Sequence, residues 1–203
     1  MNMGKATAGN EGELRKLLSA AIKWKPFSEL FDVSLDHRGS KLIGEALLDA
    51  LERGGFALDD IDAVGALTAA AVPMVTAVMQ EAGARGHELD GFVMDFVYPS
   101  IKGSSIAGKR VVLLDSWLSE KSYVQTSSLV TLRNGNELSL DFSVVEHEGA
   151  QVIAIASLVG GVGDDAGACT INVLNPVSDE ERDLPFVSAF DETSLRDGDS
   201  TAK

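Results

Sequence analysis

Hydrophobic residues in the first third of the chain change their spacing from element to element. Apolar residues recur every three or four positions over residues 12–23, which predicts an amphipathic helix ended by Pro26. Polar and apolar residues alternate in SELFDVSLDH (28–37), which predicts a strand. Helical spacing returns from Gly39 to Arg53, before two glycines. Residues 1–11 carry no such pattern and are predicted to form a disordered lead-in.

The middle of the chain repeats a strand-then-helix order. A short apolar segment, a turn of small residues and a helix broken at Gly83 follow one another within residues 61–86. Strands are predicted at 89–99 and 109–116. The nearly continuous apolar run at 151–159 is typical of a central parallel strand covered on both faces. This alternation predicts a single α/β domain over residues 12–199 with a parallel sheet.

The last third is less regular. A helix is predicted over 123–134, and the segment 134–149 is interpreted as an inserted strand or edge hairpin. A loop at 160–167 and a late strand at 170–174 follow. Residues 176–203 form an acidic C-terminal segment that is expected to be partly solvated.

Composition excludes several classes of function. The net charge is −14 over 203 residues, which argues against a nucleic-acid or anionic-membrane surface because either needs basic patches. The single cysteine, Cys169, rules out an internal disulfide and is expected to be a small buried residue. Three scattered histidines suggest no metal site. With no signal peptide and no apolar run of ~20 residues, a cytoplasmic protein is expected.

Two segments carry a resemblance to a known family. They are DAVGALTAAAVPMVTAVMQEAGARGHELDGFVM (62–94) and IAGKRVVLLDSW (106–117). In order and spacing, residues 13–158 resemble the type I phosphoribosyltransferases, most closely orotate phosphoribosyltransferases of high-GC Gram-positive bacteria, and 184–195 do so weakly. The resemblance implies a Rossmann-like parallel sheet flanked by helices, with a small N-terminal hood. It also implies transfer of ribose 5-phosphate from phosphoribosyl pyrophosphate to a base.

The family's signature strand ends in two acids that hold the ribose hydroxyls, and a glycine-rich turn then wraps the 5-phosphate. Here Leu114 replaces the first acid, and Asp115 remains as a remnant of the ribose-binding pair. The expected turn carries Trp117 and Leu118, which would instead fill the pocket with apolar surface. A carboxylate at Glu120 facing the phosphate at ~4 Å would cost ~4 kcal/mol at an effective dielectric constant of 20. The remnant phosphate-binding positions are Ser116, Ser119, Glu120, Lys121 and Ser122.

Three further family elements also differ. Thr68, Ala69 and Ala70 are the remnant of the pyrophosphate turn, where glycines and an acid are expected. Asp95 and Phe96 stand at the positions of an Arg-Lys pair, so that Lys102 is the basic residue left as a catalytic candidate. The hood segment reads SELFDVSLDHR (28–38), and an anion-binding role for Arg38 is weighed against a solvated surface pair.

These differences favour a catalytically impaired phosphoribosyltransferase-like protein that acts as a binding or oligomerisation module. Its expected partners are a second copy or a paralogue, with a nucleotide-like small molecule as a further option. The alternative is an active enzyme of nucleotide metabolism that joins orotate to phosphoribosyl pyrophosphate. It would use Asp115 on the ribose, Ser119 and Ser122 on the phosphate, and Mg²⁺, the one cofactor implied, only in that case. A nucleic-acid-binding regulator is the least favoured class.

Overall fold

The computed structural model describes residues 3–25, 29–95, 100–119, 130–133, 137–140, 143–161, 169–174 and 178–197. The described helices are α1 (Met3–Ile22), α2 (Phe31–Ser34), α3 (Gly39–Arg53), α4 (Val72–Ala84), α5 (Ser143–Glu146) and α6 (Glu192–Asp197), with short 3-10 turns η1 (Leu58–Asp60) and η2 (Ala69–Ala71). The described strands are β1 (Ala63–Ala66), β2 (Asp90–Asp95), β3 (Ser100–Gly103), β4 (Arg110–Ser119), β5 (Val130–Arg133), β6 (Glu137–Leu140), β7 (Gln151–Gly161), β8 (Cys169–Leu174) and β9 (Glu181–Asp191).

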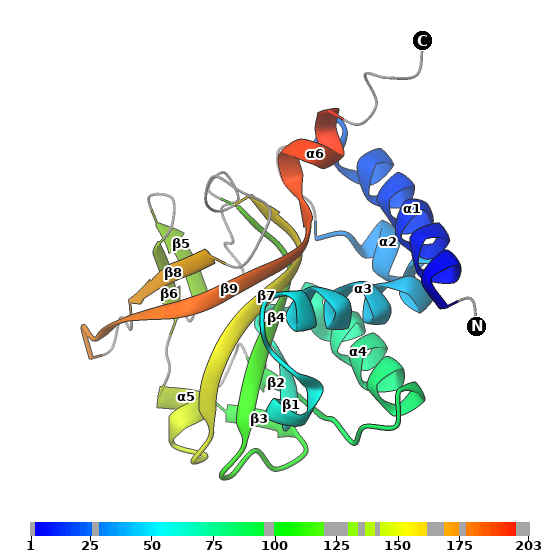
Figure 1. Ribbon diagram of the computed structural model, residues 1–203. Coiled ribbons are helices and arrows are strands. Elements are labelled where there is room, and N and C mark those ends of the chain that lie inside the picture. Colours follow the sequence, from blue (N-terminus) through cyan, green and yellow to red (C-terminus); the bar gives the residue numbers. More distant parts are fainter. Residues whose placement is uncertain are drawn as a thin grey trace.

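These strands form one sheet in the order β3-β2-β1-β4-β7-β9-β8-β6-β5. The five strands from β2 to β9 are parallel to their neighbours, whereas β3 pairs antiparallel to β2 and β8 antiparallel to β9. Helices α1 to α4 cover one face of the parallel part, and the β5, β6 and β8 end curves away from them (Figure 1). The fold is therefore a mixed α/β sheet, mostly parallel, as the sequence predicts.

Two apolar clusters lie on opposite faces of the sheet. The larger cluster fills the space between the sheet and helices α1, α3 and α4, and it includes Leu114 and Trp117 of β4. The smaller cluster contains Leu113 and Leu118 of the same strand, together with two valines of α5. Strand β4 is buried on both faces, which explains its continuous apolar sequence.

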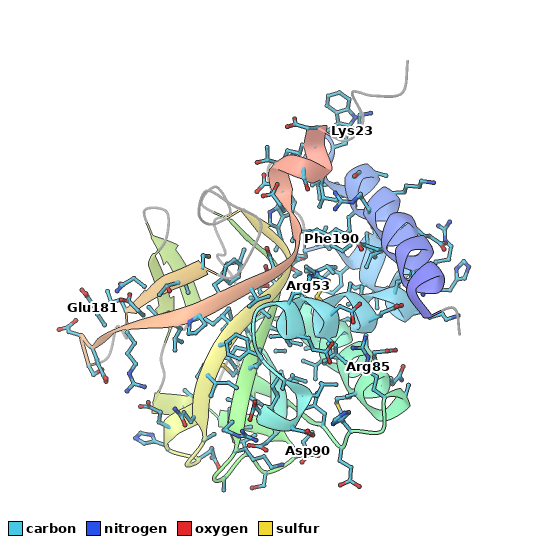
Figure 2. All side chains as sticks on the ribbon, viewed as in Figure 1. Lys23, Arg53, Arg85, Asp90, Glu181 and Phe190 are labelled. Carbon is cyan, nitrogen blue, oxygen red and sulfur yellow. The ribbon has the colours of Figure 1, made fainter. Side chains whose placement is uncertain are left out.

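Helices α3 and α4 pack closely because residue 44 is glycine. A Cβ atom at Gly44 would lie 2.3 Å from the carbonyl oxygen of Ala77. Further along both helices, Arg85 binds Asp49 at 2.7 Å and Glu81 at 2.9 Å (Figure 2). Since the Gly44–Ala77 and Asp49–Arg85 contacts follow the same order in both helices, α3 and α4 run parallel and begin at the same end.

Several elements confirm the sequence predictions. Helix α3 has the predicted bounds, Gly39–Arg53, and α4 follows the turn of small residues as expected. Strand β7 (Gln151–Gly161) is flanked by parallel neighbours on both sides, as the apolar run at 151–159 predicts.

Three predictions were wrong. Helix α1 begins at Met3, so residues 3–11 are helical instead of a disordered lead-in. Residues 31–34 form the helical turn α2 instead of a strand. Phe31 and Leu35 are exposed to solvent, and none of the described strands pairs with this segment. Residues 130–133 of the predicted 123–134 helix are strand β5, and residues 120–129 lie outside the described residues.

The acidic C-terminal segment is partly solvated, as expected, but it also contains a strand of the sheet that was not predicted. Residues 181–191 form β9, which lies between β7 and β8 inside the sheet. Alternate side chains of this strand, including Leu184, Phe186 and Phe190, are buried, so its acids occupy the remaining positions. In the 134–149 insertion, β6 (Glu137–Leu140) confirms the predicted strand, and α5 follows it.

Candidate functional site

The sequence-predicted acid, Asp115, lies in the middle of β4, just beyond the carboxyl end of the neighbouring parallel strand β1. Asp115 is 1% exposed and is paired in register with Ser157 of β7. Thr68, two residues beyond β1, donates a hydrogen bond from its hydroxyl to Asp115 Oδ1 at 2.9 Å. The backbone N–H of Ser116 donates to the same oxygen at 2.6 Å. The structure therefore brings together Thr68, Asp115 and Ser116, which the resemblance had assigned to two separate elements.

Burial controls the chemistry of this carboxyl group. Removal from water raises the pKa of Asp115 from 3.8 to about 6, although the hydrogen bonds from Thr68 and Ser116 oppose the shift. Asp115 Oδ2 has no hydrogen-bond partner among the described residues. An oxygen of this kind is costly to bury, and such groups are found at functional sites as well as in strained cores.

The phosphate-binding turn expected after Asp115 is strand up to Ser119. Strand β4 continues beside β7, with Trp117 opposite Val159 and Ser119 opposite Gly161. Trp117 and Leu118 are fully buried, in the two clusters on opposite faces of the sheet. This burial agrees with the prediction that these two side chains would fill the pocket. Glu120, Lys121 and Ser122, the other predicted remnant positions, lie outside the described residues.

Trp117 is held in place by helix α6, a contact that sequence reasoning missed. Its indole N–H donates to Glu192 Oε2 at 3.1 Å, and the guanidinium group of Arg196 lies 5.4 Å from the ring centroid. Arg196 also donates to Glu192 at 2.9 Å and to the carbonyl oxygens of Ile22 and Lys25 at 2.8 and 2.9 Å. Helix α6, the end of α1 and strand β4 thus form one packed unit.

The remnant of the pyrophosphate turn keeps its place in the fold. Ala69 and Ala70 lie in η2, which leads directly into α4, and Pro73 lies in the first turn of that helix. Thr68 is buried and directed at Asp115, while Ala69 is exposed. As predicted, the backbone turn is retained, but the one hydroxyl it offers is already engaged with the protein's own carboxylate.

Lys102 does not face Asp115. It lies on the edge strand β3, where its Nζ is 3.4 Å from Asp95 Oδ2 across the β2–β3 pair. Asp95 stands at the first position of the Arg-Lys pair that the resemblance implies. Its carboxylate pairs with Lys102, the basic residue left in this region. Phe96 lies outside the described residues.

The basic residues of the N-terminal segment are also engaged with acids. Arg38 binds Asp36, with Nε at 3.1 Å from Oδ1, and this contact holds the pKa of Asp36 at about 2. Lys25 lies 3.1 Å from Asp32. Both contacts are exposed, which favours the solvated surface pair over an anion-binding role for Arg38.

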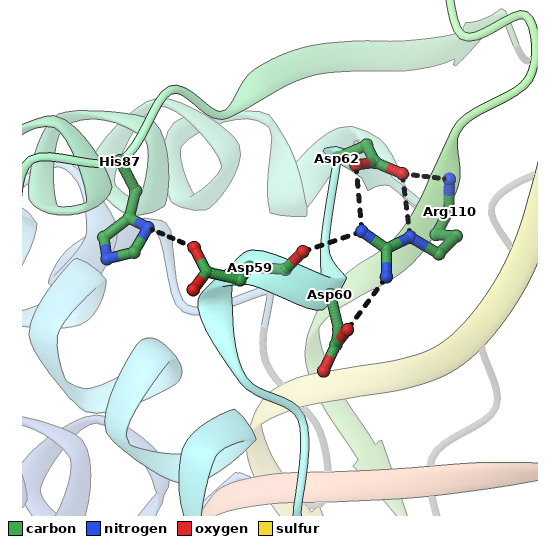
Figure 3. A network of polar contacts seen from close by, with 5 residues as sticks. All are labelled: Asp59, Asp60, Asp62, His87 and Arg110. Atoms are coloured by element: carbon green, nitrogen blue, oxygen red, sulfur yellow. Dashed lines mark hydrogen bonds and ion pairs between the residues drawn. The ribbon is translucent and has the colours of Figure 1, made fainter.

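A second polar network lies at the opposite, amino ends of the strands. Arg110 binds Asp62, Asp60 and the carbonyl oxygen of Asp59, and His87 lies 3.2 Å from Asp59 (Figure 3). The guanidinium group lowers the pKa of Asp62. Since Arg110 joins Asp62, Asp60 and the backbone of Asp59, the network is a stabilising connection between the first residues of β4 and the loop before β1.

Other features of the described part of the chain add no chemistry. These residues contain no group of three or more histidine, cysteine or acidic side chains that could hold a metal ion. Cys169 is half-buried, and burial raises its pKa, so the thiol is a weak nucleophile. Among the described helices, none is long and apolar enough to cross a membrane.

Sequence comparisons find relatives of one kind. No family model matches the chain. Orotate phosphoribosyltransferase of Streptomyces avermitilis is 28% identical over 148 residues, which span 70% of this chain and 71% of the relative. The orotate phosphoribosyltransferase of Tropheryma whipplei strain Twist is 32% identical over 155 residues, spanning 73% of this chain and 63% of the relative.

Structural comparison agrees on the fold. Mycobacterium tuberculosis orotate phosphoribosyltransferase in complex with inorganic phosphate matches with a TM-score of 0.60 at 21% identity, over 92% of this chain and 90% of that one. The same enzyme in complex with 5-phospho-alpha-D-ribosyl 1-diphosphate matches with a TM-score of 0.59, over 92% of both chains. The relatives and the fold agree: the chain has the type I phosphoribosyltransferase fold and is similar in sequence to orotate phosphoribosyltransferases over about 70% of its length.

Proposed function

We propose that this chain is an impaired member of the type I phosphoribosyltransferase family that acts by binding and not by phosphoribosyl transfer. The observation that carries the proposal is the burial of Asp115 on a continuous strand, with Trp117 and Leu118 filling both faces beyond it. A ribose-binding acid must be accessible to the hydroxyl groups of the sugar. Here one oxygen accepts hydrogen bonds from the protein and the side chain is 1% exposed.

The cost of opening the site supports the same proposal. Admitting a sugar phosphate beside Asp115 requires the end of β4 to leave β7 and Trp117 to leave the core. Exposing one large side chain alone costs about 2–3 kcal/mol, and the hydrogen bond of Trp117 to Glu192 would be lost as well. Lys102 is the basic residue left in the segment that resembles the family's mobile loop. It binds Asp95 and is not directed at the position of the leaving group.

Titration calorimetry tests the proposal. Phosphoribosyl pyrophosphate with Mg²⁺ is titrated into the purified full chain, with orotate in a parallel run and Asp115→Asn as the matched variant. At millimolar ligand, we expect no saturable binding heat that is lost in Asp115→Asn. Micromolar binding that Asp115→Asn abolishes would overturn the proposal.

An active transferase is the second candidate, and the relatives named orotate phosphoribosyltransferase favour it. In that case Asp115 would hold the ribose, Ser119 and Ser122 the 5-phosphate, and Mg²⁺ the pyrophosphate. Formation of orotidine monophosphate that is lost in Asp115→Asn would support it. The absence of turnover together with Asp115-independent binding would contradict it.

The binding role is proposed to include association with a second copy or with a paralogous chain. Trp24 and Phe31 are large apolar side chains that are exposed among the described residues, and they offer a contact surface for such a partner. Sedimentation velocity over a hundredfold range of concentration tests self-association directly. A monomer at every concentration would leave only a paralogue as the partner.

A further inference from the structure

A groove lies beside the amino-terminal halves of α3 and α4, and its lining includes neither Thr68 nor Asp115. Its volume is about 630 Å³, within the range of small-molecule sites. One wall comes from α2 and the start of α3, and the other from α4; Figure 1 shows these three helices side by side. The lining residues that matter here are Ser34, Leu35, Ser40, Lys41, Val72 and Thr76.

Helix packing makes one end of this groove electropositive. Gly44 allows α3 and α4 to lie in backbone contact and parallel, so their amino termini begin at the same end. Each amino terminus carries about half a positive charge. Asp36 offsets part of this at α3, because its Oδ1 accepts the N–H groups of Arg38 and Gly39. Helix α4 has no side-chain cap of this kind.

Lys41 is the uncompensated charge of the groove. It makes no ion pair with any described residue, in a protein with a net charge of −14. The acid that lines the opposite wall, Glu81, is engaged by Arg85 at 2.9 Å. Asp36 is likewise engaged by Arg38. An anion in the groove would therefore meet an available cation and no free carboxylate from the lining residues.

A buried hydroxyl provides a second, independent indication of a ligand. Ser34 is 2% exposed and lines the groove, yet its Oγ has no hydrogen-bond partner among the described residues. Leaving such a group unpaired destabilises the fold unless a ligand or water supplies the missing hydrogen bond. The hydroxyls of Ser40 and Thr76 line the same space, while Leu35 and Val72 offer exposed apolar surface next to them.

We propose that the groove binds a small organic anion, with one carboxylate or phosphate group at Lys41 and the three hydroxyls and an apolar body on Leu35, Val72 and Pro73. The acid group would receive a charge-assisted hydrogen bond from the ammonium group. The apolar body would cover the side chains that are otherwise exposed to water. The site does not depend on the state of Asp115, so it stands whether or not the transferase reaction is retained.

The test follows backbone amide NMR signals of the full chain during titration with two probes, phenyl phosphate and benzoate. Saturable shifts are expected at residues 34–41 and 72–76, with a dissociation constant on the order of 1 mM for probes of this size. Lys41→Met is expected to weaken binding about tenfold, and Ser34→Ala to weaken it less. Lys16→Met, an exposed lysine on α1, is the matched control and should bind normally.

The probes also separate the ligand classes and the competing explanations. Preference for phenyl phosphate indicates a phosphate ester as the natural ligand, and preference for benzoate a carboxylate. Shifts that do not saturate, or that are equal in Lys41→Met and Lys16→Met, would refute the site. Concentration-dependent shifts of the same residues without any probe would refute it too, because they would identify the groove as a contact between two copies.

Discussion

At the scale of single residues, Asp115 shows what it costs to bury an acid in the core. Its carboxyl group is buried in the core, its pKa is raised to about 6, and one oxygen lacks a partner among the described residues. A raised pKa means that the folded protein binds the proton more tightly than the unfolded chain does. The free energy of unfolding therefore falls as the pH rises from about 4 to about 6, and the loss is complete above that range.

We expect Asp115→Asn to remove this pH-dependent loss. A change in pKa from 3.8 to about 6 corresponds to about 3 kcal/mol at pH 7.5. The amide can still accept the hydrogen bonds from Thr68 and Ser116, and the constant cost of burying its NH₂ group cancels when two pH values are compared. Relative to the original chain, the variant should gain about 2.5 kcal/mol of unfolding free energy between pH 4 and pH 7.5, because a small part of the loss is already present at pH 4. Urea denaturation at the two pH values measures this gain.

Asp62→Asn is the control with the opposite sign. The pKa of Asp62 is lowered, chiefly by its hydrogen bonds with Arg110, so the ionised form stabilises the folded state. That stability is present above the usual aspartate pKa and is lost as the pH falls through the lowered value. Asp62→Asn should therefore be less stable than the original chain at pH 7.5, and the difference should shrink in acid. Equal pH profiles for the two variants would show that burial does not govern Asp115.

At the scale of elements, the contact between α3 and α4 is set by a single missing side chain. We expect Gly44→Ala to reduce the free energy of unfolding by about 2 kcal/mol or more, because its Cβ would lie 2.3 Å from a backbone oxygen. Gly83→Ala, in the same helix pair, has nothing within 4 Å and should be neutral or stabilising by up to about 1 kcal/mol. Thermal unfolding of both variants measures the contrast.

The result would be informative in both directions. If Gly44→Ala were as stable as Gly83→Ala, the two helices would not be in backbone contact. The groove beside Lys41 would then lack its rigid frame.

The sequence predicted elements whose spacing alone identifies them. Helix α3 was predicted to the residue because its apolar positions keep helical spacing between clear stop signals. The segment at 28–37 was mistaken for a strand because so short an alternation of apolar and polar residues also fits a helical turn. Pairing with a neighbouring strand distinguishes the two structures, and none of the described strands pairs with this segment. Burial of Trp117 and Leu118 could be expected from their size, but the extension of β4 through them could not, because it depends on pairing with β7.

The sequence identified individual residues of the candidate site but not the contacts between them, because these contacts join distant parts of the chain. Asp115 and Thr68 were each identified from motif positions, whereas their hydrogen bond joins residues 47 positions apart. The contact of Trp117 with Glu192 spans 75 positions and carries no local signal. The weak resemblance at 184–195 was the one hint that this part of the chain belongs to the domain.

At the scale of the whole molecule, the acidic end of the chain is part of the core. Strand β9 runs from Glu181, at the outer end of the sheet, to Phe190 beside α1, where Arg15 lies 5.3 Å from the phenyl ring (Figure 2). It joins the parallel part of the sheet to β8, and through β8 to β6 and β5. Its charge pattern suggests a solvated tail because the acids occupy alternate, exposed positions.

A truncation tests whether β9 is an integral strand of the sheet or an accessory to it. A chain that ends after Ser178 lacks β9 and α6, so β7 and β8 lose their shared neighbour and Trp117 loses its hydrogen bond to Glu192. We expect this chain to lose cooperative thermal unfolding, because a strand missing from the middle of a sheet leaves both exposed edges unpaired. A chain that ends after Asp197 keeps every described element and is the control. If the shorter chain unfolded as cooperatively as the control, β9 would be an accessory to the sheet, and the acidic segment would be free to serve as a separate partner surface.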